Sequence, residues 1–241
     1  MTRRRWIADE VSDDRAALSG AHADHLTRVL RARLGQEFDI IANGVARRGR
    51  VATIAEDRVE FELGEEIPAV TAANLTLLLA IFKFDRMEWA IEKCTELGVS
   101  RIVPLIARRT EVHLASASAK RAERWRRIAL QAAEQSRRGT APEVAAPVKL
   151  REAAKLPGAL RIVLAETEDQ TMLPELFAEH PTEGEVLLAV GPEGGWTEDE
   201  LQLLQKEGWL SASLGPTILR AETAAIAAIV LAASALGSQA K

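Results

Sequence analysis

From residue 75 onward, short apolar runs alternate with helical patterns, and this alternation constrains the fold more than any other feature of the chain. The first run, residues 75–82, is apolar apart from Thr76, which is typical of a strand covered on both faces. Four further strands are expected at residues 102–106, 160–165, 186–190 and 211–214. Strands that alternate with helices predict a parallel α/β sheet.

The segments between these strands carry helix signals. Apolar residues recur at helical spacing from 87 to 97. Asp85 is expected to cap this helix, paired with Glu88 three positions on, and Gly98 to end it. Further helices are expected at residues 119–135, 198–206 and 222–236. The last helix is apolar nearly all round, which predicts burial in the core or against a second subunit.

The first seventy residues are instead rich in strand signals. Strands are expected at residues 37–42, 51–54 and 59–63, with one helix at 22–31. Asn43 and Gly44 form a hairpin signal because both tolerate positive φ. Several short strands with tight turns predict a small barrel or sandwich. A boundary near Pro68 then divides the chain into two domains, residues 1–70 and residues 73–241.

Composition excludes several classes of protein. Hydrophobic residues make up 47% of the 241, which excludes a disordered or collagen-like chain. No apolar run approaches the length that spans a bilayer, and the basic start of the chain lacks the apolar stretch of a signal peptide. The single cysteine, Cys94, excludes an intramolecular disulfide and a multi-cysteine metal site. A cytoplasmic location is the simplest expectation.

Charge is distributed unevenly along the chain. Residues 1–140 hold 24 Lys and Arg against 20 Asp and Glu, whereas residues 141–241 hold 7 against 15. The net charge of −4 therefore conceals a basic first part. Such asymmetry fits a chain whose first part meets a polyanion, and it equally fits ordinary variation between helix surfaces.

The segment VGPEGGWTEDE, residues 190–200, joins an expected strand to an expected helix. Its glycines allow a sharp turn and close approach of a ligand to the backbone. Thr197 and Glu200 predict a capping box for the following helix. Ligands of open α/β sheets bind beyond the carboxyl ends of the strands, where this loop is expected to lie. A well-capped βα turn without a ligand explains the same pattern.

A second strand–loop–helix segment, LGPTILRAETA, occupies residues 214–224. Arg220 and Glu222 flank the start of its helix. A cation is unfavourable at that end of the helix dipole, so Arg220 is either a surface contact of Glu222 or a cation held near a ligand.

Common nucleotide, hydrolase and metal signatures are missing from the sequence. No G-x-G-x-x-G opens a βαβ unit, and neither a P-loop nor a G-x-S-x-G elbow is present. The four histidines, His22, His25, His113 and His180, lack metal-type pairing with carboxylates. The chain has no tyrosine, which argues against an aromatic platform for stacking bases.

Five ordered blocks together resemble the SPOUT class of knotted RNA methyltransferases, and within it the family that methylates N3 of one uridine in 16S rRNA. The blocks span residues 25–36, 83–99, 125–138, 191–195 and 214–223. The resemblance implies an N-terminal PUA-like β-barrel that binds RNA and a C-terminal α/β domain with a deep trefoil knot. It also implies a homodimer, S-adenosylmethionine as methyl donor, and rRNA of the small ribosomal subunit as partner. Three positions depart from the family pattern: Phe84, the 136–138 run and Thr217.

The same resemblance assigns candidate site residues. The expected cofactor-binding residues are Leu164, Ala165, Glu166, Val190, Gly191, Pro192, Glu193, Gly194, Gly195, Leu214, Gly215, Ile218, Leu219 and Arg220. Uracil N3 must lose its proton during transfer, and a preorganised cation stabilises the resulting charge. Arg220 is the expected cation, with Glu193 or Glu222 as proton acceptor or orienter. A sulfonium donor is already activated, so no metal is expected.

Phosphate contact is expected from arginines in the basic first part of the chain. The candidates are Arg3, Arg4, Arg5, Arg28, Arg31, Arg124 and Arg127. Two other functions stay open. One is a related enzyme of the class that methylates a ribose 2′-oxygen or a tRNA base. The other is a non-catalytic RNA-binding factor in ribosome assembly.

Overall fold

The computed structural model describes residues 5–67, 74–136, 138–181 and 183–239. By its contacts the chain divides into two units. The first comprises Met1–Thr71 with Ala133–Ala141, and the second Ala72–Ala132 with Pro142–Lys241. The expected domains place residues 133–141 in the second domain, and the structure differs there. The end of the long helix belongs to the first unit, where the Glu134 carboxylate accepts a hydrogen bond from the Ile7 amide at 3.5 Å.

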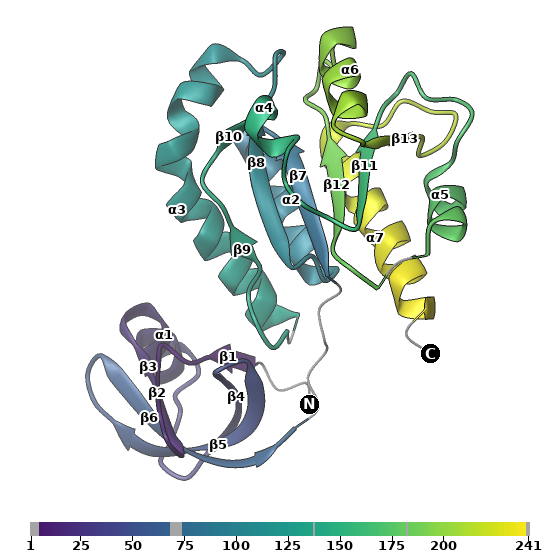
Figure 1. The fold of residues 1–241 in the computed structure, drawn as a ribbon. Coiled ribbons are helices and arrows are strands. Elements are labelled where there is room, and N and C mark those ends of the chain that lie inside the picture. The colour runs from purple at the N-terminus through teal and green to yellow at the C-terminus, as the bar shows by residue number, and fades with distance from the viewer. Residues whose placement is uncertain (1–4, 68–73, 137, 182, 240–241) are drawn as a thin grey trace. The chain divides into compact units, whose positions relative to one another are not determined.

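The first unit contains a six-stranded sheet in the order β1-β4-β5-β6-β3-β2. Its strands are β1 (Arg5–Ile7), β2 (Glu10–Ser12), β3 (Arg15–Ser19), β4 (Glu37–Ala42), β5 (Val45–Ile54) and β6 (Arg58–Glu66). β1 and β2 lie at opposite ends of this order, yet only Ala8 and Asp9 separate them in the chain. The sheet therefore curls until its edges meet, as Figure 1 shows. Its core includes Trp6, Leu18 and Phe61.

Local signals in this unit are confirmed in part. Asn43 and Gly44 both have positive φ, 51° and 81°, and join β4 to β5 as a hairpin. β5 is ten residues long and includes the expected strand at 51–54. The expected helix at 22–31 is two short pieces, α1 (Gly20–Asp24) and the π-helix η1 (His25–Val29). They end before Arg31, whose φ of 50° is not helical.

The second unit contains a parallel sheet in the order β10-β8-β7-β12-β11-β13, with β9 paired to β8. Its strands are β7 (Leu75–Ala80), β8 (Arg101–Ile106), β9 (Glu143–Val144), β10 (Val148–Lys149), β11 (Leu160–Leu164), β12 (Val186–Val190) and β13 (Leu210–Ala212). All five strands expected from the apolar runs are present, and the α/β class is confirmed.

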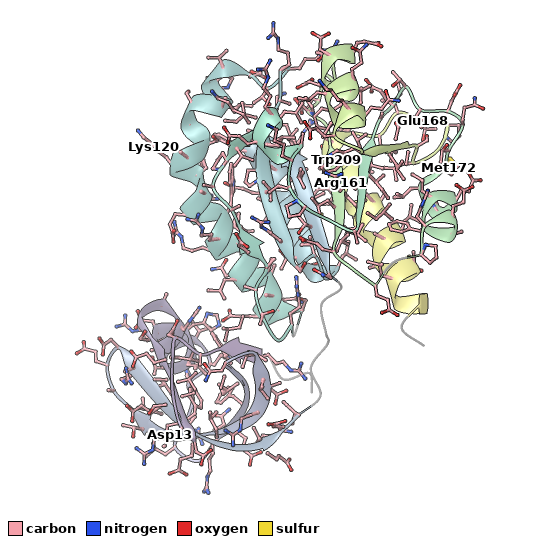
Figure 2. The ribbon with its side chains drawn as sticks, viewed as in Figure 1. Asp13, Lys120, Arg161, Glu168, Met172 and Trp209 are labelled. Atoms are coloured by element: carbon pink, nitrogen blue, oxygen red, sulfur yellow. The ribbon has the colours of Figure 1, made fainter. Side chains whose placement is uncertain are left out.

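Helices cover both faces of this sheet, so the side chains of successive β7 residues pack into two different hydrophobic cores. Leu77 and Leu79 join a core with α2 (Phe84–Glu96), α3 (Val112–Gln135), α5 (Leu173–Glu179) and α7 (Ala221–Gln239). Leu78 and Ala80 join the core under α4 (Leu150–Ala153) and α6 (Glu198–Lys206). Figure 2 shows the side chains that fill the second unit, including Trp209, whose indole N–H donates to the Ala154 carbonyl at 2.9 Å.

The expected capping pair of α2 is wrong. The helix begins at Phe84, which places Asp85 inside the first turn rather than at the cap. Glu88 does not fold back on the helix start, because the Arg124 guanidinium binds both of its carboxylate oxygens, at 2.7 and 2.9 Å. The other end is as expected: Leu97 is the C-cap, and Gly98 follows with a φ of 102°.

The end of β13 passes between the two ends of the loop that follows β11. On one side the Ala165 amide donates to the Ala212 carbonyl at 3.1 Å. On the other side the Ser213 amide donates to Thr171, and the Leu173 amide donates to Ser213, at 2.8 and 2.9 Å. Residues 212 and 213 therefore lie between the two ends of the loop formed by residues 165–171.

Candidate functional site

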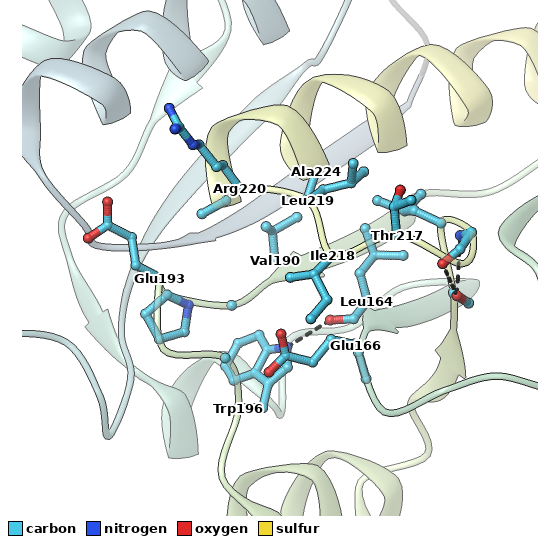
Figure 3. Close-up of a pocket in the computed structure, with 18 of the residues that line it drawn as sticks. Leu164, Glu166, Val190, Glu193, Trp196, Thr217, Ile218, Leu219, Arg220 and Ala224 are labelled. Atoms are coloured by element: carbon cyan, nitrogen blue, oxygen red, sulfur yellow. Dashed lines mark hydrogen bonds between the residues drawn. The ribbon is translucent and has the colours of Figure 1, made fainter.

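A pocket of about 340 Å³ lies beyond the carboxyl ends of β11, β12 and β13, a volume within the range of small-molecule sites. Three loops form its wall: residues 164–166, 190–196 and 212–220. The last two are the glycine-rich segments singled out in the sequence. Figure 3 shows that their side chains converge, although residues 201–213 lie between the two segments in the chain.

The loop after β12 is shaped by close contacts that exclude larger residues. The Trp196 ring packs against Gly191, where an added Cβ would lie 3.1 Å from the indole. The indole N–H donates to the Leu164 carbonyl at 2.9 Å and so joins two of the three loops. Gly195 has a φ of 70°, and an added Cβ would lie 2.2 Å from a carboxylate oxygen of Glu166. Both glycines are therefore required by close approach.

The turn after β8, which contains Arg108 and Arg109, is hydrogen-bonded to the loop after β12. The Arg109 guanidinium donates to the Gly194 carbonyl and, at 3.3 Å, to the Trp196 carbonyl. The expected capping box is confirmed: the Glu200 carboxylate accepts the Thr197 amide at 2.9 Å. Glu200 also accepts the Arg108 amide at 2.7 Å, which fixes the start of α6 to the same turn.

The loop after β13 supplies an apolar wall and an exposed cation. Leu214 and Leu219 line the pocket together with Leu164 and Val190. Ile218 lies over it and is 83% exposed. In Figure 3 the Arg220 side chain extends outward from the start of α7, on the same side as Glu193. Within the described part of the chain, the Arg220 guanidinium has no hydrogen bond or ion pair.

A charged cluster borders this side of the pocket. One nitrogen of the Arg86 guanidinium, in the first turn of α2, lies 3.0 Å from Glu193 and 3.8 Å from Glu222. The side chains of Arg86 and Glu193 are each about one third exposed, whereas that of Glu222 is 7% exposed. The second carboxylate oxygen of Glu222 is buried and has no hydrogen-bond partner among the described residues. One guanidinium is therefore shared by two carboxylates.

The structure brings the expected cofactor residues together, with one exception. Of the fourteen, only Gly194 does not line the pocket. Glu222 lies behind the wall, in contact with Arg86, rather than on it. Sequence reasoning missed Arg86 and Trp196 as pocket residues. Arg86 had a signal, because it stands in the second of the five blocks. Thr217, which departs from the family pattern, lies in the 214–220 loop that the resemblance assigns to the cofactor, and it lines the pocket.

The arginines expected to contact RNA are placed very differently from one another. Arg3 and Arg4 lie outside the described residues. Arg5 is 9% exposed and lies beside Asp39, a placement that does not favour phosphate contact.

The other four arginines of this set are exposed, and they differ in whether a carboxylate neutralises them. Arg28 pairs with Asp24 at 3.2 Å, and Arg124 pairs with Glu88, which raises the pKa of Arg124. Arg31 and Arg127 are exposed and have no ion pair within the described residues.

The described residues contain neither a metal-binding cluster nor a helix that could span a membrane. No three histidine, cysteine or acidic side chains are grouped so as to hold a metal ion. Within the same residues, no helix has the length and apolar character needed to cross a membrane.

Comparison with known proteins identifies the family. A family model described as an RNA methyltransferase domain matches residues 70–233. The chain is 33% identical over 239 residues to the ribosomal RNA small subunit methyltransferase E of Synechocystis sp., covering 95% of this chain and 76% of that protein. The chain belongs to the ribosomal RNA small subunit methyltransferase E family. The relative from Rickettsia conorii is 32% identical over 88% of this chain and 86% of its own length. The resemblance expected from the five blocks is confirmed.

Solved structures agree with this family. The ribosomal RNA small subunit methyltransferase E of Neisseria gonorrhoeae, bound to S-adenosyl methionine, matches with a TM-score of 0.84 at 33% identity over 95% of each chain. A putative methyltransferase of Legionella pneumophila, in complex with the same cofactor, matches with a TM-score of 0.85 at 29% identity, covering 97% of this chain and 98% of that one.

Proposed function

We propose that this protein transfers a methyl group from S-adenosylmethionine to N3 of a uridine in 16S rRNA of the small ribosomal subunit. The observation that carries the proposal is the joint pocket of the two glycine-rich loops, with a charged rim on one side. The family and its cofactor-bound relatives support the donor and the rRNA substrate.

The pocket suits such a donor in size and chemistry. Its apolar wall, formed by Leu164, Val190, Leu214 and Leu219, fits the flat face of an adenine ring. Gly191 and Gly195 keep the loop backbone close to any ligand, because a side chain at either position would meet Trp196 or Glu166. The donor supplies an activated sulfonium methyl group. The protein's part is to hold that methyl group and the acceptor nitrogen in line.

The charged rim fits the acceptor side of the reaction. Deprotonated uracil spreads negative charge onto its two carbonyl oxygens, and an oriented cation beside them lowers the barrier. Among the described residues, Arg220 has no acidic partner that would have to be displaced. We therefore assign Arg220 to the uracil anion and Glu193, which lines the pocket, to the proton.

The rest of the molecule is assigned to RNA binding and to the knot. The curled six-stranded sheet is the PUA-like RNA-binding barrel of this proposal. Arg31 and Arg127 are the first candidates for phosphate contact because no carboxylate neutralises them. The passage of β13 between the ends of the loop 165–171 supports a deep trefoil knot in the second unit. A cytoplasmic location completes the proposal, since the substrate is ribosomal.

We also propose a homodimer. Ala225, Ala228, Ile229 and Ala232 of α7 are buried in the core, but Val230 on the same helix is 45% exposed. The apolar character of α7 therefore continues onto its outer face, where a second subunit would cover it.

Nucleoside analysis tests the proposed activity. The protein is incubated with labelled S-adenosylmethionine and either small subunits or naked rRNA, and the RNA is digested and analysed by mass spectrometry. Label in 3-methyluridine is expected. Label in a 2′-O-methyl nucleoside, or in tRNA alone, would assign another reaction of the class. Absence of both methyl transfer and calorimetric cofactor binding would indicate a non-catalytic assembly factor.

A further inference from the structure

The three side chains of the charged cluster at the pocket rim, Arg86, Glu193 and Glu222, differ in their exposure to water. Arg86 and Glu193 form a half-exposed pair at 3.0 Å, which water screens and which is easily broken. The Glu222 side chain is 7% exposed, and one of its carboxylate oxygens has no hydrogen-bond partner within the part of the chain that the structure describes. A buried polar atom without a partner is rare and calls for an explanation.

Arg86 is the cation within reach of that buried carboxylate. Its nearest nitrogen already lies 3.8 Å from the other oxygen of Glu222. The amides in the first turn of α7 also favour a negative charge there, but they leave the second oxygen unsatisfied. A small rotation of the guanidinium toward Glu222 would pair both carboxylate oxygens in the bidentate arrangement that arginine prefers.

The same rotation would release Glu193. Glu193 and Arg86 line the pocket, whereas Glu222 does not. Glu193 is therefore the carboxylate that a base in the pocket can reach, and Glu222 is the one that can hold Arg86 away from it. While Arg86 is on Glu193, it cancels a negative charge that would otherwise repel the RNA backbone.

We propose that Arg86 is a positioning residue that exchanges Glu193 for Glu222 when RNA enters, so that Glu193 becomes free to accept the N3 proton of the uridine. This inference rests on the proposed function. The N3–H proton passes to the Glu193 carboxylate, and the N3 electron pair forms the bond to the methyl carbon. The carbon–sulfur bond breaks, and its electron pair stays on sulfur.

Neutral variants of the two partners test the exchange. In Glu222→Gln, Arg86 has no competing carboxylate and stays on Glu193. We expect the single-turnover rate of 3-methyluridine formation to fall at least about tenfold, with cofactor affinity unchanged. In the double variant Arg86→Met with Glu222→Gln, nothing holds Glu193. The rate at saturating RNA should then recover to within several-fold of the natural protein, while KM for RNA rises.

A purely structural role for Arg86 predicts the opposite order, with the double variant as slow as Glu222→Gln or slower. That result would overturn the proposal, as would a natural rate in Glu222→Gln. Arg86→Met alone leaves Glu222 buried without a cation and is expected to unfold more easily, so the double variant is the informative one. Glu193→Gln should abolish transfer in either background.

Lys93 provides the matched control. It lies on the same helix as Arg86 and pairs with Glu92 and Glu96 at 2.7 and 2.9 Å, but it does not line the pocket. Lys93→Gln should leave rate and affinity unchanged. Failure of the proposed function is a separate outcome: the natural protein itself would then form no 3-methyluridine.

Discussion

Arg220 combines exposure, lack of an acidic partner and a place on the pocket wall. We expect Arg220→Ala to lower the single-turnover rate roughly 100-fold or more, because removing one preorganised donor to a developing oxyanion has an effect of that size. Cofactor affinity, measured by calorimetry, should stay within several-fold, since the guanidinium extends outward from the rim. Near-normal turnover would remove Arg220 from the mechanism.

Gly195 tests the shape of the cofactor loop. With a φ of 70° and Glu166 2.2 Å from an added Cβ, Gly195→Ala must displace the loop, the carboxylate or both. We expect at least about tenfold weaker cofactor binding, which matches the 1–2 kcal/mol cost of a left-handed residue other than glycine. Adding Glu166→Ala should restore only part of the affinity, because the backbone strain remains.

Gly237 is the control for this substitution. Apart from its chain neighbours and the backbone of its own helix, no described residue has an atom within 4 Å of a Cβ added there, and its φ is outside the left-handed range. Gly237→Ala should bind the cofactor normally. Equal affinities of Gly195→Ala and the natural protein would show that the loop does not contact the ligand.

At this scale the sequence predicted which loops form the pocket but not how charges pair within it. The glycine motifs are local, and their place after strands follows from chain order. The partner of Glu193 comes from α2, more than a hundred residues away in the chain, so no spacing rule links the two. The same holds for Glu88. The sequence predicts a local capping role for it, but in the structure its carboxylate pairs with the guanidinium of Arg124 on α3.

At the scale of the elements, the buried thiol of Cys94 on α2 gives a prediction about the pH dependence of stability. Cys94 is fully buried, and burial raises the pKa of its thiol by desolvation of the thiolate. The unfolded chain loses this proton above about pH 8.5, whereas the folded chain keeps it. Stability is therefore unaffected below that pH and declines above it, by up to about 1.4 kcal/mol per pH unit for this one proton.

Urea denaturation at pH 7, 9 and 10 measures this decline. Cys94→Ala serves as the control: its cavity lowers stability by a similar amount at every pH, but the part of the slope that belongs to the thiol should vanish. Thiol reagents should modify Cys94 only as fast as the protein opens. Rapid modification of the folded protein at pH 7 would contradict this placement of α2.

Element predictions succeeded where burial alone sets the pattern. The apolar strands β7, β11 and β12 begin where the sequence places them, because a strand covered on both faces needs an unbroken apolar run. Predictions were less complete where the backbone departs from regular geometry. The helix expected at 22–31 is α1 and a π-helical turn in the structure. β5 begins at Val45, six residues before the expected strand, and its added residues include polar ones that pair across the curled sheet.

For the whole molecule, the exposed side of α7 predicts the oligomeric state. We expect a solution mass near twice 26.2 kDa by light scattering. Val230→Asp should shift the protein toward the monomer, because a charge at an apolar interface must be desolvated. The control is Val112→Asp on α3, an apolar residue that is 85% exposed outside α7. A natural protein that is monomeric at micromolar concentration would contradict the dimer.

The strand order and the proposed threading of β13 lie beyond what the sequence pattern can predict. Alternating strands and helices fix the parallel class, but many orders satisfy them, and connections that thread a loop are too rare to expect from spacing. The resemblance implies the knot, and the hydrogen bonds of Ser213 and Ala165 on the two sides of β13 support that proposal.

A crystal structure with S-adenosylmethionine tests the central claim most directly. The account predicts ligand density between the loops at 164–166, 190–196 and 212–220, with the methyl group directed toward the rim that carries Arg86, Glu193 and Arg220. Density elsewhere on the molecule, or a methyl group directed away from that rim, would contradict it.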